Sequence, residues 1–172
     1  MQVIDNFLNE EDYTALCDGM LSNSFPWYWG WTKTRDPDKG GGDAHIHNCQ
    51  LVHPYYRDHE KTGKHWYLIE PIVNKLEASA FIRIKANLTM ATPHIIETYM
   101  HHDYSSNMEH NIAIYYLNDN DGYTKFESTG EIIRSVGNRI LIFDGREKHC
   151  GTTHTNQKFR CVINFNYFPT VY

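Results

Sequence analysis

The sequence contains few cysteines and no Cys-x-x-Cys pair: the four thiols stand at positions 17, 49, 150 and 161 of 172 residues. Scattered thiols supply neither the paired ligands of a structural zinc site nor a dense disulfide framework. We therefore exclude zinc fingers and disulfide scaffolds. We expect the thiols to be reduced, as in a cytoplasmic protein.

Long apolar runs and an excess of positive charge are also missing. No stretch approaches the roughly 18 apolar residues of a membrane span. The start, Met1-Gln2-Val3-Ile4-Asp5, lacks the charged and apolar regions of a secretory signal. The formal net charge is −5, whereas a phosphate backbone attracts basic surfaces. We expect neither a membrane nor a nucleic acid as a partner.

The residues that are present indicate one globular domain over residues 1–172. Hydrophobic residues make up 41% of the chain and charged residues 22%, which is ordinary for such a domain. Aromatic residues reach 14%, with 12 tyrosines. This content favours strands and a pocket over a helical bundle.

The first 80 residues combine helical and aromatic segments. Asn9 is a candidate N-cap, and apolar residues then recur at helical spacing, which predicts a helix over about residues 10–22. A second helix is predicted over about 57–79, with a break before Pro71. The aromatic run at 27–31 predicts a strand. Its side chains either pack in the core or form a wall beside a substrate groove.

Two stretches between these segments leave more than one interpretation. Residues 35–44 contain three consecutive glycines, so we expect a mobile loop, either a plain connection or a lid over a pocket. His45 and His47 form a His-x-His pair, which has no carboxylate at matching spacing. We interpret residues 44–47 as a strand with a polar face rather than as a metal pair.

From Phe81 onward the pattern changes to short strands separated by turns. A series of helices followed by short strands is typical of an α+β, mainly β domain. We expect a sandwich or jelly roll over residues 81–168, with the N-terminal helices packed on one sheet. The predicted strands cover residues 81–88, 95–99, 110–117, 123–127, 131–136, 139–143 and 161–168.

One tripeptide carries a metal-binding pattern. On a strand, residues two apart face the same way, so His101 and Asp103 would project together. They would be two thirds of a 2-His-1-carboxylate triad, which suits non-heme Fe(II). Given 11 histidines and 21 acidic residues, about one such match is expected by chance. The third ligand would come from a distant strand, and His149 and His154 are the candidates.

Arg160 opens the last predicted strand, where Arg160, Val162, Asn164 and Asn166 share a face. An arginine and an amide suit a barrel interior that holds an anion, because a guanidinium fork binds a carboxylate through two hydrogen bonds. The alternative is a polar edge that faces solvent.

These motifs together resemble the double-stranded β-helix of the 2-oxoglutarate- and Fe(II)-dependent dioxygenases. The similarity is to the prolyl-hydroxylase-like branch, whose small members are viral or bacterial, so a viral member would work in the host cytoplasm. It covers residues 81–168, and the N-terminal run Ile4-Asp5-Asn6-Phe7-Leu8 is also similar. The matching pieces are His101-x-Asp103, Ile114-Tyr115-Tyr116-Leu117-Asn118, Gly122-Tyr123-Thr124-Lys125-Phe126, Arg139-Ile140-Leu141-Ile142-Phe143, His149 and Arg160.

The resemblance implies a role for each site residue. Fe(II) would be bound by the triad, Arg160 would hold the distal carboxylate of 2-oxoglutarate, and Tyr116 and Asn164 would assist it. The triad is His101, Asp103 and His149.

The same resemblance implies an activity. O2 and 2-oxoglutarate would be consumed, succinate and CO2 released, and a C–H bond hydroxylated. The substrate would be an unidentified protein, peptide or small molecule, and a peptidyl proline is one candidate. Many prolyl hydroxylases carry a tyrosine before the metal motif, and the run at 85–90 carries none.

Two other functions fit the same residues. A jelly roll with a vestigial metal site could be a non-enzymatic binding module. A zinc-dependent hydrolase could use the same triad, because two histidines and a carboxylate also hold zinc. Arg160 and Tyr116 favour a keto acid over hydrolysis.

Overall fold

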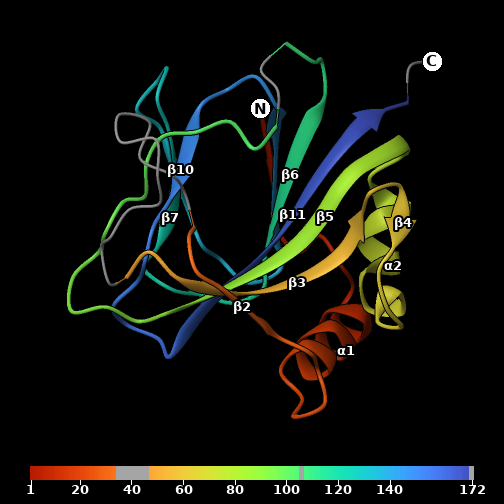
Figure 1. The fold of residues 1–172 in the computed structure, drawn as a ribbon, viewed down its shortest axis with the longest axis horizontal. Helices are drawn as coiled ribbons and strands as arrows, with labels where there is room; N and C mark the ends of the chain where they lie inside the picture. Colours follow the sequence, from red (N-terminus) through yellow and green to blue (C-terminus); the bar gives the residue numbers. More distant parts are fainter. Residues whose placement is uncertain (34–46, 105–106, 171–172) are drawn as a thin grey trace.

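The computed structural model describes residues 1–33, 47–104 and 107–170. Over these residues the chain is mainly β, with two antiparallel sheets that face each other and two helices on one side of the larger sheet (Figure 1). This arrangement confirms the predicted jelly roll with N-terminal helices packed on one sheet.

Eight strands of the described residues form the large sheet, and three form the small one. In spatial order the large sheet contains β1 (Gln2–Ile4), β9 (Arg139–Asp144), β6 (Asn111–Tyr116), β11 (Phe159–Pro169), β5 (Ala78–Met90), β3 (Gln50–Arg57) and β2 (Tyr28–Gly30), and β4 (Glu60–Lys61) pairs with β3. The small sheet contains β10 (His149–Gly151), β7 (Tyr123–Phe126) and β8 (Ile132–Arg134). Strands β1 to β4 come from the first 80 residues, so this part contributes to the sheet as well as the helices.

The near-continuous apolar sequence of β6 follows from its position, because both faces of the strand are buried. Ile112, Ile114 and Tyr116 face the small sheet, in one apolar cluster. Ala113 and Tyr115 alternate with them and face the helices, in the other cluster. We call these the inner and outer faces of the large sheet.

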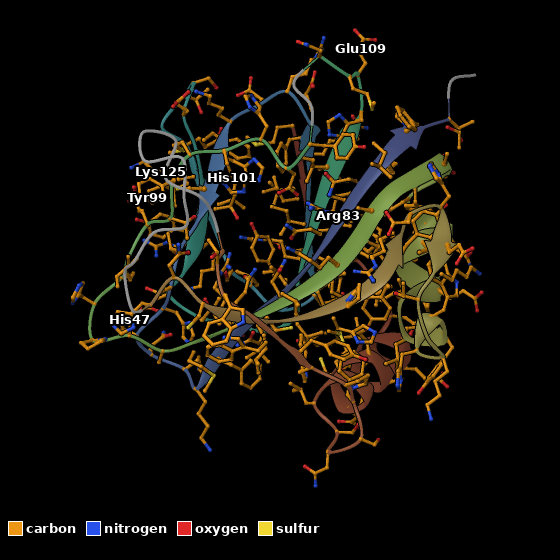
Figure 2. The ribbon with its side chains drawn as sticks, in the orientation of Figure 1. His47, Arg83, Tyr99, His101, Glu109 and Lys125 are labelled. Carbon is orange, nitrogen blue, oxygen red and sulfur yellow. The ribbon has the colours of Figure 1, made fainter. Side chains whose placement is uncertain are left out.

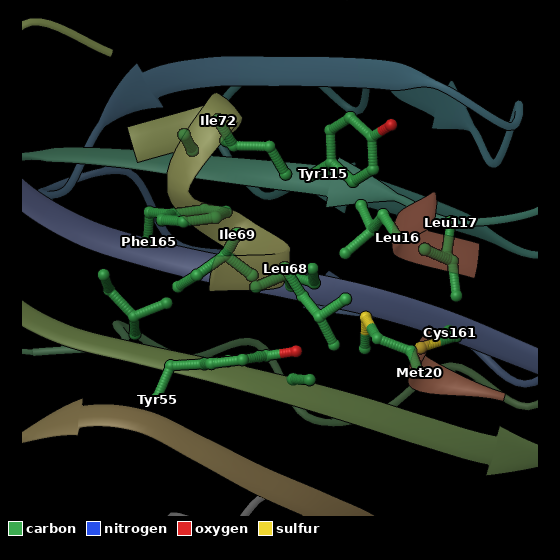
Figure 3. Packing of buried hydrophobic residues seen from close by; sticks show 14 of the residues in the cluster. Leu16, Met20, Tyr55, Leu68, Ile69, Ile72, Tyr115, Leu117, Cys161 and Phe165 are labelled. Atoms are coloured by element: carbon green, nitrogen blue, oxygen red, sulfur yellow. The ribbon is translucent and has the colours of Figure 1, made fainter. Parts of the chain in front are cut away.

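The two helices cover the outer face. Helix α1 (Glu10–Met20) begins after Asn9, whose Oδ1 accepts a hydrogen bond from the Asp12 N–H at 2.8 Å, as predicted for an N-cap. Leu16 and Met20 of α1 pack with Ile69 of helix α2 (Trp66–Lys75) against the sheet (Figure 3). The predicted helix at 10–22 is confirmed within two residues.

The second predicted helix, over 57–79, is wrong in its extent. Its first residues end β3, and Asp58 and His59 turn the chain with φ of 54° and 65° into β4. Pro71 lies inside α2 and does not break it, because the buried residues on either side hold the helix against the sheet. No helix in the described part of the chain is long and apolar enough to cross a membrane.

The predicted strand at 95–99 is also wrong: this segment makes one isolated bridge, between Glu97 and Thr152, and a second bridge follows it between His101 and His149. Side-chain hydroxyls interrupt the ladder. The Ile96 N–H donates to Thr153 Oγ1 at 2.8 Å, where a strand would use a carbonyl.

Asn138 joins the N-terminal segment to the large sheet. Its Oδ1 accepts from the Leu8 N–H and the Tyr115 hydroxyl, each at 2.8 Å, and its Nδ2 donates to the Leu8 carbonyl at 2.9 Å. Its φ of 60° is left-handed, which asparagine tolerates. Three buried side-chain bonds therefore depend on one residue.

We expect Asn138→Gly to lower the free energy of unfolding by about 2–4 kcal/mol, because glycine keeps the φ and loses these bonds. Urea denaturation measures the change. Asn6→Gly is the matched control, since Asn6 is exposed with φ of 51°, and it should change stability by less than about 0.5 kcal/mol. Equal stability of both variants would contradict this role for Asn138.

Candidate active site

A cavity of about 100 Å³ lies between the inner face of the large sheet and the small sheet. His149 and Thr124 line it from the small sheet, and Arg160 and Lys85 line it from the large one. In Figure 2, His101 and Arg83 belong to segments on opposite sides of the space between the sheets.

His101 and His149 are held side by side by their backbones. Each N–H donates to the carbonyl of the other, at 3.0 and 3.1 Å, and the ring centroids are 4.9 Å apart. The Nδ1 of His101 lies 2.9 Å from the Tyr99 carbonyl, and that of His149 lies 3.2 Å from the Glu147 carbonyl. A carbonyl only accepts, so each Nδ1 carries the proton. Nε2 is therefore the nitrogen that each ring offers to a metal, which at His101 would replace the contact with Asp103.

Asp103 presents one carboxylate oxygen to the histidines and anchors the other. Its Oδ1 lies 3.5 Å from His101 Nε2. Its Oδ2 accepts from Asn166 Nδ2 at 3.2 Å and Asn164 Nδ2 at 3.4 Å, and it pairs with Arg83 Nη2 at 3.3 Å. This arrangement fixes the carboxylate for binding through one oxygen.

Charges around the three side chains are arranged for a cation. Burial would raise the pKa of Asp103, but the hydrogen bond with His101 and the charge of Arg83 hold it well below its usual value. Burial lowers the pKa of His149. Burial also acts to lower the pKa of His101, but the hydrogen bond and charge of Asp103 outweigh it, so that pKa is raised. A fixed anion beside two imidazoles fits a divalent cation.

One potential ligand atom from each of His101, Asp103 and His149 lies within 4.8 Å of the others. The structure thus brings together the three residues that the sequence suggested. His154 is fully buried elsewhere, with Nε2 3.0 Å from the Gln157 carbonyl, and it is absent from this described cluster.

The anchoring of Asp103 gives a testable expectation. Asn166→Ala removes the shortest of its amide donors, so we expect divalent-metal affinity to fall by about 10- to 100-fold. Competition against a chromogenic chelator measures the affinity, and thermal unfolding of the metal-free protein checks the fold. Affinity equal to wild type would show that the amide does not position the carboxylate.

Arg160 is buried, with 6% of its surface exposed. Its Nε donates to Ser135 Oγ at 2.9 Å and its Nη2 to the Tyr123 carbonyl at 3.4 Å. Gly122 leaves room for its stem, because a Cβ there would lie 2.8 Å from Arg160 Cδ. No carboxylate of residues 1–33, 47–104 or 107–170 pairs with this charge, and the side chain lines the cavity. The arrangement suits an anion inside it.

Tyr116 and Asn164 occupy positions that the sequence did not specify. The Tyr116 hydroxyl donates to Thr124 Oγ1 at 2.8 Å, and Thr124 rather than Tyr116 lines the cavity. The Arg160 guanidinium lies 5.8 Å from the Tyr116 ring centre. Asn164 lines the cavity and bonds to Asp103. Their assignment to the co-substrate stays a prediction.

Sequence reasoning missed Arg83, Lys85 and Lys33. The first two alternate on β5, and Lys85 is opposite Asn164 of β11, so they share the inner face. The alternation at 81–88 showed that they share a face, but not that this face lines a cavity. Lys33 follows β2 and lines the same cavity.

The aromatic run at 27–31 divides between core and surface. Trp27 packs against the main core, whereas Trp29 and Trp31 are 55% and 82% exposed. Trp29 and His47 line a second cavity of about 70 Å³, which shares Lys33 with the first. The proposed lid at 35–44 and residues 44–46 of the predicted strand lie outside the described residues.

Comparison by sequence identifies no relative: no family model and no curated protein matches the chain. Solved structures do match. A Trichoplax adhaerens prolyl hydroxylase, in complex with a hypoxia-inducible-factor peptide, has a TM-score of 0.66 at 14% identity, covering 97% of this chain and 82% of that one. The viral collagen prolyl hydroxylase of Paramecium bursaria Chlorella virus-1 gives 0.60 at 12% identity, with coverage of 98% and 90%.

A third match has another chemistry. The non-heme α-ketoglutarate-dependent epimerase SnoN of nogalamycin biosynthesis has a TM-score of 0.62 at 11% identity, covering 97% of this chain and 75% of that one. At these identities the likeness shows the fold. The chain therefore has the double-stranded β-helix fold of the 2-oxoglutarate- and Fe(II)-dependent oxygenases, with a His-x-Asp…His triad gathered inside it.

Proposed function

We propose that the protein is an Fe(II)- and 2-oxoglutarate-dependent dioxygenase that hydroxylates its substrate. One observation carries the proposal: a metal triad and a buried arginine without a carboxylate partner in the described residues line the same cavity. The balanced reaction converts 2-oxoglutarate, O2 and a C–H bond into succinate, CO2 and a C–OH group. When bound, Fe(II) supplies the activation of O2 and the oxidation of the keto acid.

The protein side chains bind, orient and exclude water. His101, Asp103 and His149 would hold Fe(II) on one side, which leaves positions for the keto acid and O2. Arg160 would fix the far carboxylate of 2-oxoglutarate. The apolar residues Ile114 and Val162 line the cavity beside it and limit water.

The other two functions have weaker support. A zinc hydrolase needs no buried arginine for a dicarboxylic acid, and Arg160 would then carry an unexplained charge. A binding module would not need Asp103 Oδ2 to be anchored by three donors. We propose a cytoplasmic location from the scattered cysteines of the sequence.

The substrate is a separate question. Two of the similar structures are named prolyl hydroxylases, which supports a peptidyl proline as one candidate. Because SnoN is an epimerase with the same fold, the fold alone does not select the substrate.

The proposal is tested by incubating the protein with Fe(II), O2 and 2-oxoglutarate and measuring succinate and CO2. We expect slow formation of both in equal amounts without added substrate, and none when Zn(II) replaces Fe(II). The Asp103→Ala variant is the protein control. Succinate no higher than with this variant, at saturating Fe(II) and 2-oxoglutarate, would contradict the proposal.

A further inference from the structure

Two lysines line the cavity besides Arg160. Lys85 lies on β5 and Lys33 follows β2, so both line the cavity from the large sheet, whereas His149 lines it from the small one. Asn87 and Gln50 complete this wall with uncharged polar side chains. The only acidic side chain that lines the cavity within the described residues is Asp103.

The two lysines have different charged neighbours. Lys85 interacts electrostatically with Arg83 and Asp103. Its register partner Asn164 also bonds to Asp103. Lys33 interacts instead with Cys49 and, unfavourably, with Arg160.

Neither ammonium has a hydrogen-bond or ion-pair partner among the residues that the structure describes. Burial lowers the pKa of Lys33 to about 8, and it lowers the pKa of Lys85 as well. An unpaired, partly buried cation costs stability, so a structural role does not explain these residues.

The proposed reaction does not need Lys33 or Lys85 to balance a charge either. Asp103 pairs with Arg83, and a divalent cation bound to the triad would balance the remaining charge. Of the two carboxylates of 2-oxoglutarate, one would pair with Arg160 and the other would chelate the metal. Lys33 and Lys85 therefore remain without an anionic partner, and a neutral prolyl peptide would not supply one.

We infer that the Lys33–Lys85 wall is an anion subsite for the hydroxylated substrate, which is a small acid that carries a carboxylate or a phosphate. The anionic group lies against Lys85, and this contact holds a neighbouring C–H bond toward the metal. The inference rests on the proposed function and specifies its substrate class.

The test uses Zn(II)-loaded protein with saturating 2-oxoglutarate, so that no turnover occurs. Ligand-observed NMR measures the binding of acetate and propionate, of their amides, and of inorganic phosphate. We expect the anions to bind and the amides not to bind. Tighter binding of carboxylates than of phosphate would identify a carboxylic acid substrate, and the reverse would identify a phosphorylated one.

Lys85→Met and Lys33→Met remove each charge with little change in volume. We expect each to weaken anion binding by about 10-fold or more, and Lys85→Met to bind 2-oxoglutarate within about 3-fold of wild type. The metal-free variants should unfold at a Tm roughly 2–4 °C higher, because an unpaired buried charge is gone. Lys64→Met is the matched control at an exposed lysine and should change neither property.

The inference would be overturned if anions bound no tighter than amides, if neither bound, or if Lys85→Met bound anions like wild type. If the lysine variants lost 2-oxoglutarate binding rather than anion binding, the lysines would be assigned to the co-substrate. This result would also overturn the inference, but it would leave the dioxygenase proposal intact. Wild-type protein that binds no 2-oxoglutarate would instead refute the proposed function itself.

Discussion

Replacing Arg160 with alanine should raise the dissociation constant for 2-oxoglutarate by roughly 10- to 1,000-fold, with little change in metal affinity. The co-substrate is a dianion whose far carboxylate must be held while its keto-acid end chelates the metal. In this cavity the buried guanidinium is anchored by Ser135 and Tyr123 and has no described carboxylate partner. Each charge-assisted hydrogen bond that it gives a carboxylate contributes about 1.5–3 kcal/mol.

Arg160→Lys should weaken binding less than Arg160→Ala, because lysine keeps the charge and loses the two-pronged geometry. Calorimetry on Zn(II)-loaded protein measures both constants. Arg134→Ala is the matched control, since Arg134 is exposed on β8, and it should bind like wild type. If Arg160→Ala also binds like wild type, the far carboxylate lies elsewhere and the best distinction from a zinc hydrolase is lost.

Replacing His149 with alanine should abolish iron binding and turnover while the fold stays largely intact. Its Nε2 is one of three ligands, so the loss should exceed the roughly 100-fold effect of an outer-shell change. His101→Ala and Asp103→Ala should behave in the same way. Equilibrium dialysis with Fe(II) under anaerobic conditions measures binding, and circular dichroism checks the fold.

His154→Ala is the informative control. Both histidines are buried and stand five residues apart, but His154 faces the Gln157 carbonyl and lies outside the triad. We expect His154→Ala to keep wild-type iron affinity. If His154→Ala lost iron and His149→Ala kept it, the third ligand would be wrongly assigned.

The sequence could predict the strands marked either by apolar–polar alternation or by a continuous apolar run. Residues 81–88, 110–117 and 139–143 all lie within or nearly within strands of the large sheet. The predicted 57–79 helix failed because Asp58 and His59 adopt left-handed turns that no apolar periodicity reveals. The segment at 95–99 failed because Thr153 supplies a side-chain acceptor, which a strand pattern does not show.

At the site, the sequence could identify residues that stand at a recognisable spacing along the chain. His101 and Asp103 stand two apart, and His149 had to be matched to them across a long gap by resemblance. Lys33 and Lys85 carry no motif, because their significance arises only when two sheets enclose them. The sequence alone does not show that Lys85 faces the cavity, because this depends on the register between β5 and β11.

The central claim is that the triad and Arg160 together hold Fe(II) and 2-oxoglutarate. Anaerobic titration of the wild-type protein with Fe(II) and then 2-oxoglutarate tests it most directly. The keto acid chelating Fe(II) should give a weak visible charge-transfer band, which saturates at one equivalent of iron and is absent with Zn(II) or in Asp103→Ala. No band at saturating concentrations of both, from protein that binds Fe(II), would contradict the claim.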